Sequence, residues 1–414
     1  MRSAGSVLII VENLPVPFDR RVWMEATTLQ RAGYEVSVIC PVGKGYEAEY
    51  EELDGVHIYR HPMPPEGNGA LGYLREYAVA IRWELKLAKK VWDERGFDLV
   101  HICNPPDFLF LVAGYFKAFK GVKVIFDQHD INPELYEAKY GRRDIFYATL
   151  LAAERATFAT ADVVISTNES YREIALTRGK KADDQVFIVR SGPDLKRFKP
   201  TIANGAYRRG KRFLVGYLGV MGQQEGIDCL LRSIQHIVKT RTDIHFMLIG
   251  NGPAFDELQA LVIELGIGDY VEFTGRVGDA ELLERLSTCD VCVNPDPKTP
   301  FNDKSTMNKI LEYMALGKPI VQFDILEGRR SAAAASLYAT DEVDFAAKIL
   351  ELLGDPLRSA LMGQEGRRRM SQALEWAHQA PKLLAAYARA FGHPVRTLPA
   401  EVVPVEAPQP AEVI

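Results

Sequence analysis

The sequence lacks several features that would place it in common classes of protein. Its five cysteines are odd in number and scattered over 414 residues, so they predict no disulfide framework. No apolar run reaches the roughly 18 residues of a membrane-spanning helix, and the first residues enter a strand-like segment with no signal-peptide core or cleavage site. A net charge of -5 disfavours nucleic acid as a bulk partner. We therefore expect a cytoplasmic protein.

Motifs for several kinds of chemistry are also missing. The sequence contains no Asp-X-Asp, no G-x-S-x-G and no P-loop. Cys289 and Cys292 form a CxxC, but no second pair accompanies it, and the surrounding CDVCV is typical of a strand. Core positions are therefore favoured over zinc ligands. We expect neither a resident metal nor another cofactor.

The residues that are present predict two α/β domains. The chain is 47% hydrophobic and 25% charged, as in ordinary globular proteins, and it is longer than one core usually supports. Short apolar runs alternate with amphipathic segments, and such strands form parallel sheets covered by helices on both faces. The first half is therefore a doubly wound domain. Its main predicted strands are 7–12, 35–40, 98–103, 122–129 and 162–168.

The pattern restarts after the polar, basic stretch 193–212, which is a credible linker. A second series of strands and helices then predicts another Rossmann-like domain, followed by a helix over 374–391 and a Pro-rich, disordered tail over 395–414. Ligands of such domains bind at the carboxyl ends of the strands, so we expect a cleft between the domains. The second series of strands is 213–219, 244–250, 270–275, 290–295 and 319–324.

The segment 294–324, NPDPKTPFNDKSTMNKILEYMALGKPIVQFD, is the most informative. A strand ends there in a polar loop, and a helix is predicted to begin near Ser305 or Thr306, either of which could be its N-cap. The backbone N–H groups of Met307 and Asn308 would then form an anion site suited to a diphosphate.

Two charged side chains follow on the same predicted helix. Glu312 lies where a carboxylate could accept both hydroxyls of a ribose, and Lys309, one turn earlier, could add positive charge beside the phosphates. A capped amphipathic helix with solvated Lys309 and Glu312 fits the spacing equally well.

This segment resembles the nucleotide-sugar signature of the family 4 retaining glycosyltransferases of the GT-B fold. The resemblance implies two Rossmann-like domains facing a central cleft, over 1–195 and 196–374, and a helix over 375–394 that returns to the first domain. It also implies retaining transfer of a sugar from a UDP- or GDP-sugar to a glycan or polyprenyl-linked acceptor in surface-polysaccharide assembly. Further matching motifs, in the family's order, are VRSGPDLKRFKP (189–200), YLGVMGQQEGIDCLLRSI (217–234), FMLIGNGP (246–253), VEFTGRV (271–277) and LEWAHQAPKLLAAY (374–387).

The sequence departs from the family pattern at the donor site. Of two family glutamates eight positions apart, Glu312 matches the second, which holds the ribose, whereas the first falls on Lys304. Asp296 and Asp303 could substitute for that carboxylate. The family's diphosphate-binding Arg and Lys fall on Val220 and Glu225, so Lys304, Lys309 and Arg276 become the candidates for the missing charge. The resemblance adds Gly219, Met221, Gly222 and Gly250 to the nucleotide-sugar site.

These departures leave two alternatives open. One is a nucleotide-sugar-binding pseudo-enzyme, and the other is a GT-B-fold epimerase acting on UDP-N-acetylglucosamine. Slow hydrolysis of the donor would distinguish an active transferase from a pseudo-enzyme, which would lack it. An epimerase would convert the donor without any acceptor.

The first domain supplies the remaining candidates. His129 lies at the carboxyl end of a predicted strand and Asp130 follows it. The resemblance implies that His129 contacts the donor sugar, although a lone histidine there is also a common structural hydrogen-bonding residue. With Lys304 they are the predicted catalytic residues. A basic surface turn explains the two arginines among the acceptor-side candidates equally well. Those candidates are Arg20, Arg21, Asn104 and Asn132.

A basic, aromatic helix is predicted over 71–92. It could rest on an anionic membrane surface, in keeping with a polyprenyl-linked acceptor at the inner face of the membrane. It could equally be a packed surface helix whose lysines extend to solvent. Its basic residues are Arg75, Arg82, Lys86, Lys89 and Lys90.

Overall fold

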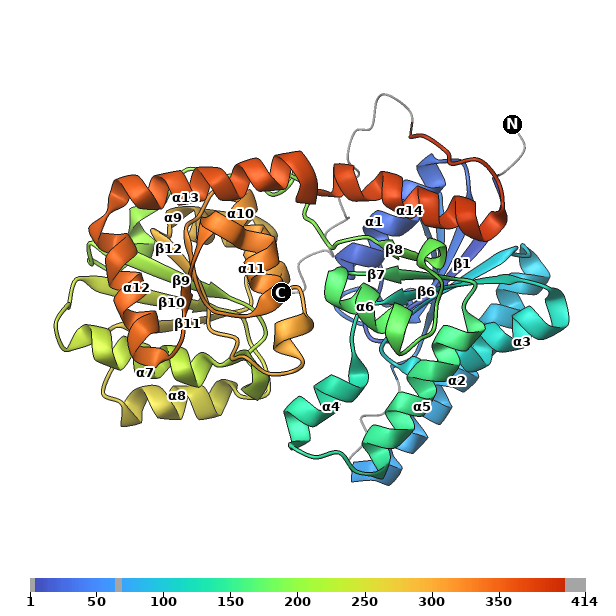
Figure 1. Ribbon diagram of the computed structural model, residues 1–414, viewed down its shortest axis with the longest axis horizontal. Coiled ribbons are helices and arrows are strands. Elements are labelled where there is room, and N and C mark those ends of the chain that lie inside the picture. The colour runs from blue at the N-terminus through green and yellow to red at the C-terminus, as the bar shows by residue number, and fades with distance from the viewer. Residues whose placement is uncertain (1–3, 64–68, 399–414) are drawn as a thin grey trace. The chain divides into compact units, whose positions relative to one another are not determined.

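The computed structural model describes residues 4–63 and 69–398, with side chains from residue 77 onward in the helix that begins at Gly69. The chain divides into two compact units, Met1–Ser191 with Trp376–Ile414, and Gly192–Glu375. Each unit is built around a predominantly parallel sheet with helices on its faces (Figure 1), which confirms the predicted fold class. The predicted tail from residue 399 lies outside the described residues.

The first unit contains an eight-stranded sheet in the order β3-β4-β2-β1-β5-β6-β7-β8. Strand β3 runs antiparallel to β4, and the other pairs are parallel. The strands are β1 (Ser6–Ile10), β2 (Glu35–Pro41), β3 (Tyr50–Leu53), β4 (Val56–His61), β5 (Leu99–Cys103), β6 (Lys123–Gln128), β7 (Val163–Ser166) and β8 (Val186–Ile188).

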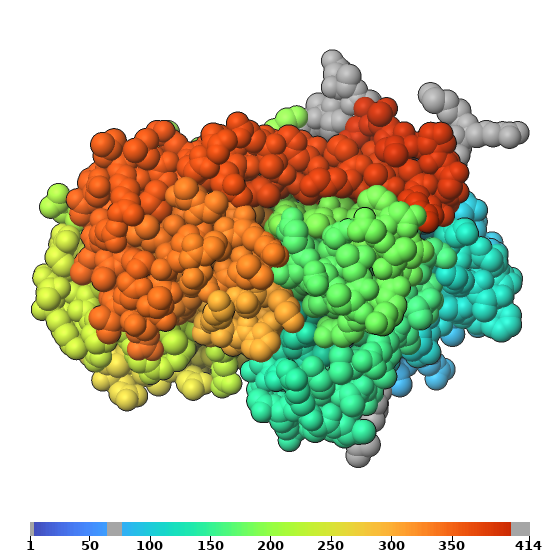
Figure 2. All heavy atoms as spheres, in the orientation of Figure 1, coloured from blue at the N-terminus to red at the C-terminus, as the bar shows by residue number. Residues whose placement is uncertain are grey.

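Helices of the first unit pack a continuous apolar core against this sheet. The last helix, α14, contacts α1 and strands β6 to β8, so a segment from the end of the chain completes the core of the first unit. In Figure 2 this red helix lies against the green residues of the same unit. The helices are α1 (Arg20–Arg31), α2 (Gly69–Glu94), α3 (Phe110–Lys120), α4 (Asn132–Tyr140), α5 (Ile145–Thr160), α6 (Glu169–Thr177) and α14 (Trp376–Phe391).

The second unit contains a six-stranded parallel sheet in the order β11-β10-β9-β12-β13-β14. The predicted core positions Cys289 and Cys292 are both buried. The strands are β9 (Phe213–Leu218), β10 (Ile244–Ile249), β11 (Val271–Gly275), β12 (Val291–Asn294), β13 (Ile320–Phe323) and β14 (Ser336–Ala339). The helices are α7 (Ile227–Val238), α8 (Phe255–Glu264), α9 (Asp279–Thr288), α10 (Asn308–Ala315), α11 (Leu326–Ala332), α12 (Glu342–Gly354) and α13 (Pro356–Arg369).

The strand order of each sheet indicates where a ligand is expected to bind. In the first sheet β1 lies between β2 and β5, and in the second β9 lies between β10 and β12, so the chain switches direction across the sheet beside β1 and beside β9. Loops that leave the carboxyl ends at such a switch diverge and expose backbone groups to a ligand. The loop before α1 and the loop after β9 occupy these positions.

Helix α2 contains the basic segment predicted to contact a membrane. Lys86 lies over the ring of Trp83, and Lys89 lies over the ring of Tyr115, so both ammonium groups rest on aromatic faces of the first unit. The Arg75 side chain lies outside the described residues. Within the described part of the chain, we find no helix with the length and apolar character needed to cross a bilayer.

Candidate functional site

Two glycine-lined loops, after β9 and β10, meet the loop after β12 at the carboxyl edge of the second sheet. Gly250 follows β10 with φ +139°, and a Cβ at this position would lie 1.9 Å from the Gly219 carbonyl oxygen. Gly226 has φ +63°, and its Cβ would lie 2.1 Å from the Pro295 carbonyl oxygen. Glycine is therefore required for the loops after β9, β10 and β12 to approach each other at backbone distance.

The predicted glycine-loop residues are brought together by these contacts. The backbone N–H of Met221 donates to the Asn251 carbonyl at 3.1 Å, and the Met221 carbonyl accepts from Ala254. Gly219 and Gly222 lie in the same loop, and Met221 is buried. The structure thus places Gly219, Met221, Gly222 and Gly250 at one edge of the sheet, while their contact with a nucleotide stays a prediction.

The predicted start of helix α10 is wrong. The N-cap is Met307, without a side-chain cap, and Asn308 is the first helical residue. Ser305 does not cap the helix because its hydroxyl donates to the Phe301 carbonyl at 2.9 Å and closes the preceding 3-10 turn. Thr306 therefore lies before the helix in a connecting segment. A helix-terminal anion site would begin near Asn308 rather than after Thr306.

Lys309 is the centre of a buried charge cluster rather than a solvated side chain. It is 8% exposed, and its ammonium lies 2.9 Å from Glu225 Oε2 and 3.1 Å from Asp296 Oδ2. The ammonium also lies 5.0 Å from the centre of the Tyr217 ring. Residues of the loops after β9 and β12 thus meet a lysine of α10, one turn before Glu312. We call Glu225, Asp296 and Lys309 the lysine cluster.

Burial sets the protonation of the lysine cluster. Loss of hydration raises the pKa of Asp296 to about 7, although Lys309 opposes this shift. Burial lowers the pKa of Lys309, but the carboxylates of Asp296 and Glu225 outweigh it and hold that pKa well above its ordinary value. Lys309 therefore keeps its charge, and Asp296 exchanges its proton near neutral pH.

The other predicted residues of the second unit lie around this edge. Lys304 ends the 3-10 turn and is half-buried, Arg276 is exposed after β11, and Glu312 is half-buried in α10. Asp303, a predicted substitute for the missing glutamate, accepts from the backbone N–H of Leu326 at 2.7 Å. Their roles toward a donor stay predictions.

In the first unit, two predicted acceptor-side residues hold the loop that carries His129. Asn104 Oδ1 accepts from the backbone N–H groups of His129, at 2.8 Å, and Asp130, at 3.2 Å. The Asn104 and Asn132 amides donate to the two oxygens of Asp107 at 2.8 and 2.7 Å. Burial raises the pKa of Asp107 to about 6. Both asparagines are buried, and their contact with an acceptor stays a prediction.

The side chain of His129 contacts a buried carboxylate that the sequence reading missed. Its Nε2 lies 2.6 Å from Asp127 Oδ2. Arg21 is buried, and its guanidinium donates to both Asp127 oxygens, to the Val189 carbonyl and to Ser191 Oγ. Arg20, half-buried, is the first residue of α1. The signal that could have found Asp127 is an acidic residue directly after the apolar run VIF of its strand.

Three possible metal ligands, His101, Cys103 and Asp127, lie within 4.8 Å of one another in the first unit. Arg21 already donates to both oxygens of Asp127, and burial raises the pKa of the Cys103 thiol well above its ordinary value. A guanidinium at the carboxylate and a protonated thiol both oppose a cation at this position. The group is therefore better described as part of a hydrogen-bonded cluster.

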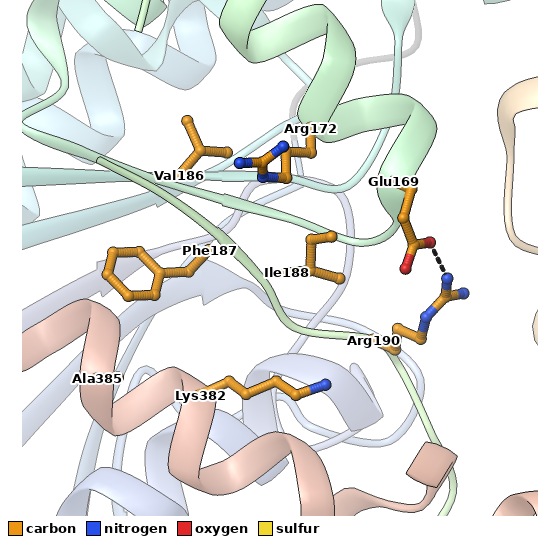
Figure 3. A pocket seen from close by; sticks show the side chains of 8 residues that line it. All are labelled: Glu169, Arg172, Val186, Phe187, Ile188, Arg190, Lys382 and Ala385. Atoms are coloured by element: carbon orange, nitrogen blue, oxygen red, sulfur yellow. Dashed lines mark hydrogen bonds and ion pairs between the residues drawn. The ribbon is translucent and has the colours of Figure 1, made fainter. Parts of the chain in front are cut away.

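A shallow cavity of about 390 Å³ lies elsewhere in the first unit, between α6, β8 and α14. Figure 3 shows Glu169 and Arg190 directed toward each other across its rim, where they form an ion pair. Arg172 is likewise paired, with Asp183. No predicted site residue lines this cavity.

Comparisons with known proteins agree with this architecture. Residues 19–190 match the model of the glycosyl transferase 4-like domain, and residues 212–355 match that of glycosyl transferases group 1. An MMP alpha-(1->4)-mannosyltransferase of Mycolicibacterium hassiacum is 24% identical over 399 residues, which cover 88% of this chain and 92% of that protein.

Solved structures share the fold along almost the whole chain. A sucrose-phosphate synthase of Thermosynechococcus elongatus superposes with a TM-score of 0.77 at 19% identity, covering 94% of this chain and 99% of that one. HepE of Anabaena, in complex with UDP and glucose, gives 0.71 at 16% identity and covers 93% and 99%. With both units matched by family models in the expected order, the chain belongs to the family 4 glycosyltransferases of the GT-B fold.

Proposed function

We propose that the protein transfers a sugar, with retention of configuration, from a nucleoside-diphosphate sugar to a hydroxyl of a glycan or lipid-linked acceptor. The second unit binds the nucleotide, and the first unit binds the acceptor. Surface-polysaccharide assembly at the inner face of the membrane is the context that the family resemblance favours. The UDP and glucose bound by the related HepE structure support a donor of this class.

The observation that carries the proposal is the lysine cluster beside the glycine-lined loops. Departure of a diphosphate needs a preorganised positive charge, and Lys309 supplies a buried one at the carboxyl edge of the second sheet. Glu225 and Asp296, the acidic partners of Lys309, can both be displaced by a phosphate. Glu225 lies partly exposed on a short 3-10 turn, and Asp296 takes up a proton near neutral pH. Lys309 can then neutralise the ligand instead.

The remaining roles follow from the same proposal. Glu312 accepts the ribose hydroxyls, and Lys304 and Arg276 add charge at the donor. Asp130 and His129 contact the reacting sugar, while Arg20, Arg21, Asn104 and Asn132 shape the acceptor side. Retention without an enzymic nucleophile requires a same-face path, in which the leaving phosphate accepts the proton of the attacking hydroxyl.

The test measures release of nucleoside diphosphate from UDP- and GDP-sugars, with and without glycan and polyprenyl-phosphate acceptors. Release by the wild type, lost in Glu312→Ala and kept in the surface control Glu351→Ala, supports the proposal. Proton NMR of the product then reports its anomeric configuration, and an inverted product contradicts retention. An unchanged rate in EDTA is expected. Because Glu351 is an exposed residue of α12, its loss should leave the donor site intact.

One observation favours a second candidate, a nucleotide-sugar binder without turnover. Lys309 is already paired with Glu225 and Asp296, so the ligand must displace them before the lysine can stabilise a leaving group. A binder would hold the donor and release no diphosphate over many hours. Conversion of UDP-N-acetylglucosamine to its epimer without an acceptor would instead indicate an epimerase.

A further inference from the structure

A group of buried polar side chains surrounds Asp127 in the first unit. They come from four elements that are far apart in the sequence, and each is at most 7% exposed. His129 lies at the edge of the group with 13% of its side chain exposed. The buried members are Arg21 and Glu25 of α1, His101 of β5, Asp127 of β6 and Tyr387 of α14.

The contacts decide which of the two carboxyl groups carries a charge. Arg21 Nε and Nη2 donate to the two oxygens of Asp127 at 3.0 and 2.7 Å, which is the bidentate geometry of a strong ion pair. Burial opposes ionisation of Asp127, but Arg21 and the N–H groups of His129 and His101 hold its pKa well below the usual range. Glu25 lies 3.1 Å from Arg21 yet makes no well-aligned hydrogen bond.

Glu25 is accordingly the neutral member. Burial, and then repulsion by Asp127, raises the pKa of Glu25 well above its ordinary value. Arg21 and Asp127 thus balance each other, and Glu25 keeps its proton. A single buried carboxylate, already paired with a guanidinium, is also the arrangement that costs the least desolvation.

This charge assignment fixes a proton on His129. Asp127 has no proton to give, so the 2.6 Å contact between its Oδ2 and His129 Nε2 requires a hydrogen on the imidazole nitrogen, because two lone pairs would repel at this distance. Arg21 Nε lies 3.1 Å from the same nitrogen and 3.0 Å from Asp127 Oδ2, and its hydrogen goes to the carboxylate, which is the charged acceptor of the two. In the neutral ring, Nδ1 then has no hydrogen and can only accept. The Asn104 bond to the backbone N–H of His129 fixes the main chain from which this ring projects.

Helix α14 supports the far side of Asp127 through His101. Burial lowers the pKa of His101, so its ring is neutral and carries one hydrogen. Nε2 faces the ionised Asp127 Oδ2 at 3.6 Å and is the nitrogen that carries this hydrogen, so Nδ1 accepts from the Tyr387 hydroxyl at 2.7 Å. A tyrosine near the end of the chain thereby holds a histidine against the carboxylate that contacts His129.

We propose that Asp127 is a positioning residue that keeps His129 in the Nε2–H form, so that Nδ1 accepts a hydrogen bond from a sugar hydroxyl. The identity of the ligand as a sugar rests on the proposed function. The protonation form of His129 does not, and it can be measured in the ligand-free protein.

The first experiment records long-range ¹⁵N–¹H spectra of the imidazoles in full-length protein labelled with ¹⁵N-histidine, with His129 assigned by its absence in His129→Gln. The wild type is expected to show the hydrogen on Nε2. In Asp127→Asn, the amide oxygen keeps the Arg21 Nη2 bond and its NH₂ group faces His129, so the hydrogen should move to Nδ1. Glu25→Gln replaces a neutral carboxyl by a neutral amide, and it should leave the Nε2–H form unchanged.

The second experiment separates positioning from structural support. If the wild type transfers sugar, Asp127→Asn should lower kcat about 100-fold or more, as wrong-tautomer variants of positioned histidines do. Its KM for the donor should change less than about threefold, because the second unit binds the nucleotide. The four tryptophans all lie in the first unit, so an unchanged urea midpoint by tryptophan fluorescence shows that Asp127→Asn is folded.

Two results would overturn the inference. One is a wild-type His129 with its hydrogen on Nδ1, which needs no variant and stands even if Asp127→Asn does not fold. The other is one equivalent of tightly bound metal by elemental analysis, because a metal would take the lone pair of His101 and an oxygen of Asp127. Absence of any transfer by the wild type would refute the proposed function alone and leave the spectra to decide this one.

Discussion

Replacing Lys309 by methionine should destabilise the second unit by an amount that depends on pH. Methionine keeps most of the apolar stem but leaves Asp296 and Glu225 facing each other without a cation. Breaking a buried ion pair in this way costs about 3–5 kcal/mol if both acids stay ionised. Asp296 can escape part of that cost by taking up a proton, since its pKa is already about 7 with the lysine present.

The pH dependence follows from this proton. A carboxyl whose folded pKa is raised destabilises the folded state progressively as pH rises from its unfolded value to its folded pKa, by about 1.4 kcal/mol per pH unit. In the wild type this decline ends near pH 7. Without Lys309 the folded pKa of Asp296 rises further and the decline continues, so the variant should lose about 1 kcal/mol more at pH 8 than at pH 7.

Urea unfolding at pH 6.5, 7 and 8 can assign the effect to one unit. All four tryptophans belong to the first unit, so tryptophan fluorescence follows that unit and far-UV circular dichroism follows both. Lys309→Met should shift the circular dichroism transition alone. The control Lys348→Met removes a surface pair with Asp344 in α12 and should change stability by less than about 0.5 kcal/mol. A loss that is equal at all three pH values, or one seen in the fluorescence, would refute the reasoning.

Three further predictions use single side chains. Because burial raises the pKa of Glu25, the wild type should lose stability between pH 5 and 7 more steeply than Glu25→Gln. Unfolding followed by tryptophan fluorescence measures this, and parallel plots of stability against pH for the two proteins would contradict it. Binding of UDP or GDP near pH 7.5 should take up protons, because the added negative charge raises the pKa of Asp296 further. Calorimetry in buffers of different ionisation enthalpy measures how many protons are taken up, and a result of no proton uptake would contradict the prediction. Gly250→Ala should lower the free energy of unfolding by more than about 2 kcal/mol and weaken nucleotide binding, because the new Cβ would lie 1.9 Å from the Gly219 carbonyl oxygen. The control Gly268→Ala has open space at its Cβ and should change stability and binding little.

The parts of the fold that depend on local pattern were predictable. Apolar runs such as VLIIV and FMLI indicated buried parallel strands, and their alternation with helices indicated two doubly wound sheets. The predicted glycines 219, 222 and 250 marked two of the loops that meet at the carboxyl edge of the second sheet, and the structure adds Gly226. The start of α10 was misjudged because Ser305 has two uses for its hydroxyl, and the preceding turn takes it.

The electrostatic partners were not predictable, because they are distant in sequence. Lys309 is separated from Glu225 by 84 positions, and Arg21 from Asp127 by 106. Spacing along one helix suggested that Lys309 was solvated or bound a phosphate, and it gave no sign of two carboxylates from other loops. Likewise the two arginines at the start of α1 read as one surface feature, whereas Arg21 is buried and Arg20 is half-buried.

The central claim is that the second unit binds a nucleoside diphosphate through the glycine-lined loops, the lysine cluster and Glu312. Isothermal titration of UDP, GDP, dTDP and ADP into the protein, and into Glu312→Ala and Glu351→Ala, tests it most directly. One diphosphate should bind the wild type and Glu351→Ala with equal affinity, and Glu312→Ala at least about tenfold more weakly. If no diphosphate binds, or if Glu312→Ala binds as tightly as the wild type, the nucleotide does not occupy this edge of the sheet.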